Sequence, residues 1–81
     1  MKKILKKVRA IMADLETDCL TIECCDYKVK GTLLTHCYYD DIKDEFIFTS
    51  GDMVNDGIAE EIILNDEQTK DVLELIVECY G

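Results

Sequence analysis

The spacing of apolar residues changes along this chain, and that change limits the fold more than any other feature. In residues 2–15, apolar side chains recur at i, i+3, i+4 and i+7, the spacing of an amphipathic helix. At about 100° per residue they fall within an arc of roughly 120°; they are Ile4, Leu5, Val8, Ile11, Met12 and Leu15. The basic residues of the segment lie on the opposite side: Lys2, Lys3, Lys6, Lys7 and Arg9. We therefore expect a helix over residues 2–15.

The middle of the chain changes to an alternating pattern. Residues 19–25 (CLTIECC) place Leu20, Ile22 and Cys24 on one face, which predicts a half-buried strand. After a tight turn at residues 26–28, residues 28–39 read as one long second strand in which Gly31 marks a bulge. A polar loop then precedes a third strand, EFIFT, at residues 45–49.

The last third of the chain predicts a short strand and a second helix. Residues 58–64 alternate like a strand but also suit one helical turn, and we favour a fourth strand. Asn65 as N-cap and Gln68 three residues later form a capping-box pattern, which predicts a helix over residues 66–80. Its apolar arc of roughly 200° is wider than one contact needs, so it indicates a second contact, either with the amino-terminal helix or with another subunit.

These elements predict one α+β domain over residues 1–81. The expected order is helix, three strands, a short fourth strand and helix (α-β-β-β-(β)-α), with both helices on one face of an antiparallel sheet. The expected core is Leu5, Val8, Ile11, Leu15, Leu20, Ile22, Leu33, Phe46, Phe48, Ile62, Val72 and Ile76.

The cysteines raise the question of a metal or redox centre. Their number is five, which is odd, and the charged amino terminus has no apolar core of an export signal. No apolar run approaches the roughly 18 residues of a membrane span. We therefore expect a cytosolic protein whose cysteines are free thiols packed like small hydrophobic residues.

A zinc site would have to use Cys24, Cys25, His36 and Cys37. Structural zinc sites prefer spacings such as C-x₂-C, whereas adjacent residues on a strand point to opposite faces. We therefore predict no metal and no cofactor. The single histidine, His36, has no serine in a nucleophile elbow and no patterned carboxylate beside it, so we predict a non-enzymatic protein.

The segment DMVNDGIAEEI resembles a calcium loop only in part. With Gly57 at loop position 6, Asp52 and Asp56 fall at positions 1 and 5, but Val54 and Ile63 occupy positions that need an Asx ligand and a bidentate Glu. We interpret this segment as a turn with Asx caps.

Charge is the feature most informative about partners. The chain has 18 acidic and 9 basic residues, and from residue 10 onward 18 acids face 4 bases, a net charge of −14. Such a body repels nucleic acid and attracts basic surfaces, so we expect no direct nucleic-acid or membrane partner. The acids may be grouped by position as a first loop group (Asp40, Asp41, Asp44 and Glu45), a second loop group (Asp52, Asp56, Glu60 and Glu61) and a helix group (Asp71, Glu74 and Glu78).

The leading hypothesis is a small acidic interaction protein that binds a basic site on a larger protein through the two loop groups. In size, charge and element order the chain resembles phage anti-defence proteins and toxin-immunity proteins, and that resemblance implies an inhibitor. Separately, the excess of acids would allow such a surface to imitate the phosphate spacing of nucleic acid. The first alternative is an accessory homodimer with acids that only confer solubility. The second is a small Cys/His metal-binding protein.

Overall fold

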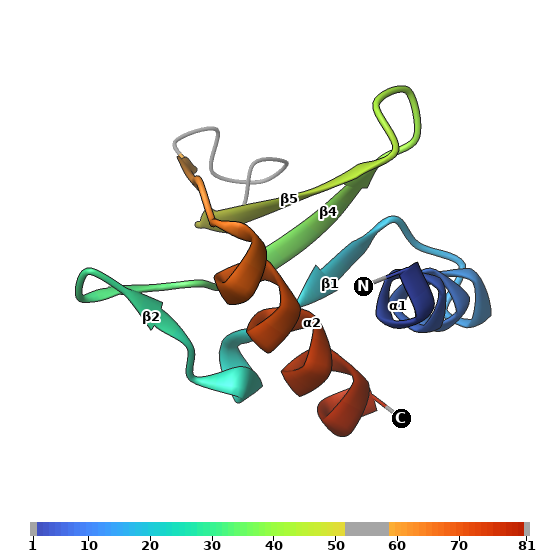
Figure 1. Cartoon of the computed structure of the whole chain (residues 1–81), viewed down its shortest axis with the longest axis horizontal. Coiled ribbons are helices and arrows are strands. Elements are labelled where there is room, and N and C mark those ends of the chain that lie inside the picture. The colour runs from blue at the N-terminus through green and yellow to red at the C-terminus, as the bar shows by residue number, and fades with distance from the viewer. Residues whose placement is uncertain (1, 52–58, 81) are drawn as a thin grey trace.

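The computed structural model describes residues 2–51 and 59–80 and places two terminal helices on one face of an antiparallel sheet (Figure 1). Helix α1 spans Lys2–Asp14 and helix α2 spans Asp66–Tyr80. Between them lie β1 (Cys19–Thr21), the 3₁₀ turn η1 (Glu23–Cys25), β2 (Lys28–Val29), β3 (Thr32–Leu33), β4 (His36–Asp40), β5 (Glu45–Ser50) and β6 (Glu60–Ile62). The predicted α+β class is confirmed, and residues 60–62 are the short fourth strand of the main sheet.

The main sheet has the order β1-β4-β5-β6, with every pair antiparallel. Its register aligns one row of apolar side chains: Leu20 is opposite Cys37, Cys37 is opposite Phe48, and Phe48 is opposite Ile62. The first three of these side chains are buried and Ile62 packs against them. This row is the sheet's contribution to the core, on the face that the helices cover.

The core as a whole matches most of the prediction. Its buried members are Val8, Met12, Leu20, Ile22, Leu34, Cys37, Phe48, Val72, Leu73 and Ile76. The predicted residues Leu5, Ile11, Phe46 and Ile62 pack against this set as half-buried side chains. Two predicted core residues, Leu15 and Leu33, do not belong to it.

Leu15 is excluded because α1 ends before it. The helix stops in a Schellman motif, in which Thr17 N–H donates to Met12 O and Glu16 N–H donates to Ala13 O. Glu16 takes the left-handed conformation (φ 54°) that this motif requires. The chain turns away from the core at this point, and Leu15 is left 53% exposed.

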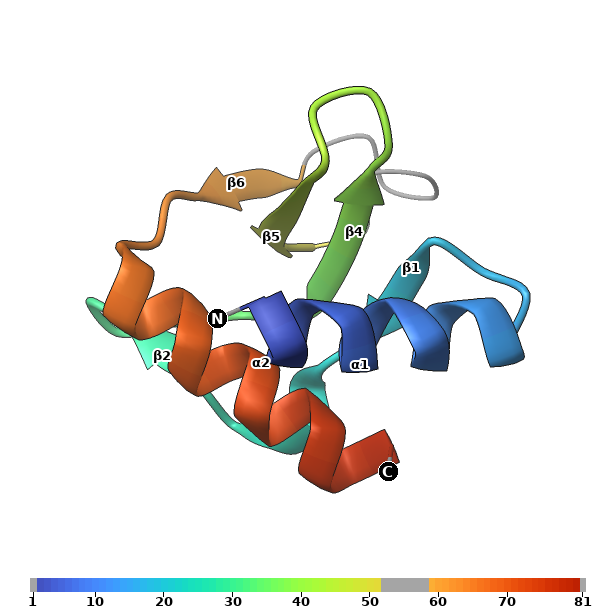
Figure 2. The same cartoon turned by 45° about the vertical axis from the view of Figure 1, so that its right-hand side comes forward.

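Helix α2 begins where the capping box predicted. Asn65 Oδ1 accepts from Gln68 N–H at 2.7 Å, and Gln68 Oε1 accepts from Asn65 N–H at 3.1 Å. Much of its wide apolar face is covered within the chain, because α2 packs against α1 and against η1 as well as over the sheet (Figure 2). The width of that face therefore gives no argument for a second subunit.

The predicted strand over residues 19–25 is wrong beyond Thr21. Ile22 N–H still donates to Thr35 O, but residues 23–25 then form the 3₁₀ turn η1, which ends at Asp26 in the left-handed region (φ 49°). The side chains of Cys24 and Cys25 therefore do not follow the alternation of a strand.

The predicted long strand over residues 28–39 is also wrong. β2 and β3 form a separate hairpin with Val29 opposite Thr32, and β4 begins only at His36. Lys30 (φ 52°) and Gly31 (φ 81°) both have positive φ, as in a two-residue type I′ turn, so Gly31 is a turn residue and not a bulge. This turn moves Leu34, rather than Leu33, into the core.

Candidate functional site: a groove with an acidic rim

A groove of about 460 Å³, open to solvent, lies where β5 and β6 meet the first turns of the two helices. Its apolar lining comes from three parts of the chain and includes Leu5 on α1, Phe46 and Phe48 on β5, and Ile62 and Leu64 in or just after β6. Of these five residues, Phe48 is buried and the other four are half-buried. The groove thus exposes the edge of the hydrophobic core to solvent.

The groove stays open because of where the helices pack. Helix α2 runs from the β6 side of the molecule towards η1, and its contacts with other elements include α1 and η1 (Figure 2). β6 is an edge strand of the main sheet, and among the described residues it pairs with β5 alone. Sheet and helices therefore diverge at the β6 end, and the half-buried apolar side chains there remain accessible.

The rim of the groove is acidic. The described residues that line it include four carboxylates, on Asp44, Glu45, Glu61 and Asp66, and one basic residue, Lys43. Glu45 and Glu61 are exposed, and neither has an ion pair or side-chain hydrogen bond with another described residue. Asp66 is also exposed and unpaired among the described residues, but it lies in the first turn of α2, where its charge is engaged by the helix dipole. Glu45 and Glu61 are therefore the rim carboxylates most available to a cationic partner.

The first loop group divides into two kinds of residue. Asp40 Oδ1 accepts from the N–H groups of Ile42 (3.0 Å) and Lys43 (3.3 Å), so it stabilises the turn between β4 and β5. Asp41 and Glu45 are exposed and have no such role among the described residues. Only part of the predicted group is thus available for binding.

Asp44 is occupied by contacts within the chain. It accepts a hydrogen bond from the Tyr39 hydroxyl, and its Oδ1 lies 3.8 Å from Arg9 Nη1. The Arg9 guanidinium carbon also lies 4.4 Å from the centroid of the Tyr39 ring, a cation–π contact. The hydrogen bond to Asp44 raises the pKa of Tyr39 above its ordinary value. Arg9, on the basic face of α1, therefore partly neutralises the negative charge of Asp44 within the chain.

The second loop group is only half described. Asp52, Asp56 and most of the predicted Asx turn lie outside the described residues. On β6, Glu60 lies opposite Ser50 of β5 and Glu61 lies opposite Thr49 of β5. Both glutamates are exposed. Glu61 belongs to the groove rim, which joins this group to Glu45 of the first group although 16 positions separate them in sequence.

The helix group forms a solvated face on α2. Asp71, Glu74 and Glu78 are all exposed, and Glu74 lies 4.0 Å from Lys70 in an i, i+4 pair. None of the three lines the groove. They provide a natural control for experiments on the rim.

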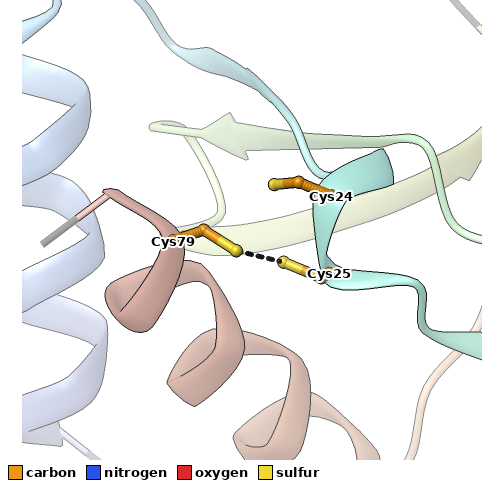
Figure 3. A group of neighbouring side chains, drawn as sticks. All are labelled: Cys24, Cys25 and Cys79. Carbon is orange, nitrogen blue, oxygen red and sulfur yellow. Dashed lines mark hydrogen bonds between the residues drawn. The ribbon is translucent and has the colours of Figure 1, made fainter.

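The four residues that a zinc site would have to use, which we did not predict to bind metal, are divided between two places. Cys37 is buried in the core, where desolvation raises the pKa of its thiol, and His36 Nδ1 lies 2.8 Å from Thr35 Oγ1. Cys24 and Cys25 instead lie on η1 beside Cys79 of α2, which the sequence analysis did not consider as a ligand (Figure 3). None of the five cysteines, all of which are described, forms a disulfide.

Comparison with protein-family models, with curated proteins and with solved structures gave no significant match. Within the described ranges, neither helix has the length and apolar character needed to cross a lipid bilayer.

Proposed function

We propose that this protein is a non-enzymatic interaction protein whose groove binds a basic and partly apolar segment of a larger protein. The observation that supports the proposal is the pairing of an apolar floor with an acidic rim in one open groove. The floor, which is the apolar lining of the groove, is stabilised when a partner covers it and removes it from water. The acidic rim selects a partner segment of positive charge. A solubilising surface needs the acids but not the exposed apolar floor beside them.

The expected energetics follow from the two parts of the groove. Burial of one Leu or Val side chain of the partner against the floor contributes about 1.5–3 kcal/mol. Glu45 and Glu61 would be partly desolvated by the bound segment, so their contacts with lysine or arginine would be stronger than those of solvated acids. The net charge of −9 would also increase the rate of association and make it sensitive to salt.

The proposal also includes the cellular compartment of the protein and the effect of binding on the partner. Five free thiols suit a reducing compartment, and we propose the cytosol. Clusters of lysine and arginine are typical of nucleic-acid-binding surfaces, so a protein that occupies such a segment would inhibit its owner. The homodimer alternative makes a different prediction, because a second copy would fill the groove and the isolated protein would sediment as a dimer.

The location of binding can be tested by NMR with a synthetic peptide of alternating lysine and leucine. We expect amide shift changes around Leu5, Phe46 and Ile62, with little change along the outer face of α2. A peptide of alternating lysine and serine provides the control for charge alone, and it should give much smaller changes at the floor. Equal changes with both peptides, or changes confined to the helix group, would refute a groove-specific interaction.

A further inference from the structure

Three thiols from two distant parts of the chain, those of Cys24, Cys25 and Cys79, meet at the carboxy-terminal end of α2. Cys25 Sγ lies 3.7 Å from Cys79 Sγ, and the sulfur atoms of Cys24, Cys25 and Cys79 all lie within 4.8 Å of one another (Figure 3). Cys24 and Cys79 are exposed and Cys25 is half-buried. The cluster is thus accessible to an ion from solvent, and none of its residues lines the groove.

The local backbone explains why two adjacent cysteines can serve one site. In a 3₁₀ turn of 3.0 residues per turn, consecutive side chains diverge by about 120°, not the roughly 180° of a strand. Helix α2 then brings Cys79 to η1, and the Tyr80 hydroxyl donates to Thr21 O at 2.5 Å, which ties the last turn of α2 to the chain just before η1. The three sulfurs are therefore positioned by elements that the fold already holds together.

The sulfur separations fit a three-coordinate metal ion. With metal–sulfur bonds of about 2.3 Å, three sulfurs in a trigonal plane lie about 4.0 Å apart. The Cys25–Cys79 sulfur separation of 3.7 Å is close to this value and no pair is farther apart than 4.8 Å, so modest side-chain rotations would complete the site. Thiolate ligands favour soft ions such as Cu(I), whereas structural zinc sites are four-coordinate, and the cluster among the described residues has three members.

We propose that Cys24, Cys25 and Cys79 form a binding site for Cu(I), held by three thiolates. On binding, three S–H bonds break, three S–Cu bonds form, and three protons pass to the solvent, with copper remaining in the +1 state. The proposal concerns a second site and does not rest on the function proposed for the groove.

The closeness of the three sulfur atoms also favours a bound cation. Thiolates placed this close repel one another, and a bound cation removes that repulsion. Without a metal, the same proximity would suit a Cys25–Cys79 disulfide, which needs an external oxidant such as a disulfide or peroxide.

The test is an anaerobic titration of the whole protein with Cu(I) in competition with bicinchoninate, a chromophoric Cu(I) chelator. We expect one Cu(I) per chain, and a loss of at least about tenfold in affinity for Cys25→Ser and for Cys79→Ser. Cys19→Ser is the matched control, because Cys19 is a half-buried thiol outside the cluster. Circular dichroism would verify that each variant is folded.

Three results would overturn the proposal. One is failure of the parent protein to withdraw Cu(I) from the chelator. Another is a loss of affinity in Cys19→Ser as large as that in Cys25→Ser or Cys79→Ser. The third is a Cys25–Cys79 disulfide, found by peptide mapping, in protein kept in a reducing glutathione buffer.

Discussion

Truncation of Leu34 tests the part of the fold in which the structure departs most from the sequence pattern. Leu34 is 0% exposed, so Leu34→Ala removes side-chain atoms from a filled core and leaves a cavity. Such substitutions cost about 2–5 kcal/mol. A chain of 81 residues has a free energy of unfolding of roughly 4–12 kcal/mol, so this one change should remove a large share of it.

Leu33→Ala is the matched control, because it makes the same chemical change one position earlier. Leu33 is half-buried and lies outside the core cluster, so its truncation should cost about 1 kcal/mol. Urea unfolding followed by circular dichroism would give both values, with an unchanged dependence on denaturant showing that the unfolded states are comparable. A cost for Leu33→Ala equal to or above that for Leu34→Ala would refute the hairpin and restore the long strand with a bulge.

Three further predictions concern single residues. Asn65→Ala removes the side-chain cap of α2, and thermal unfolding should show a loss of about 1 kcal/mol. Glu16→Gly relieves a left-handed backbone at the end of α1, so the same assay should show a gain of about 0.5–1 kcal/mol, whereas Glu16→Ala should give none. Burial raises the pKa of Cys37, so mass spectrometry should find its thiol unmodified by iodoacetamide at pH 8.5 until denaturant is added; labelling of Cys37 in the native protein at the rate of Cys19 would contradict its burial.

The ends of the chain could be predicted from sequence because their signals are local. The apolar spacing of residues 4–12 acts within α1 alone, and the Asn65–Gln68 pair acts at the start of α2 alone. The structure confirms both signals. The alternation of EFIFT was likewise sufficient for β5. In each case the residues that carry the signal are those that form the element.

The middle of the chain could not be predicted as well because its pattern is ambiguous. A Lys-Gly pair is not a strong I′ turn signal, and alternation on either side of Gly31 suits one strand with a bulge as well as a hairpin followed by a new strand. The alternation through Ile22 likewise continues into Cys24, although η1 has already replaced the strand. Hydrogen bonds such as Leu34 N–H to Tyr27 O settle the choice, and they are not visible in the sequence.

The candidate sites were less predictable than the fold because both depend on contacts between distant segments. Counting acids identified Glu45 and Glu61, but not that they border one groove with Leu5 of the first helix. Similarly, Cys79 is 54 positions from Cys25, and no spacing rule relates them. Charge and composition could indicate what kind of partner to expect, whereas the place of binding required the tertiary structure.

The central claim, that the groove rim rather than total charge binds a basic partner, can be tested by one comparison of dissociation constants. Fluorescence anisotropy would measure binding of the lysine–leucine peptide to two double variants with the same change in net charge. In Glu45→Gln/Glu61→Gln the rim loses the two carboxylates that are not at the helix terminus and not paired within the chain, and affinity should fall by at least about tenfold. In Asp71→Asn/Glu78→Gln the helix face loses as many, and affinity should change by less than about twofold. Equal losses in the two variants, or none in either, would contradict the account and favour acids that serve only solubility.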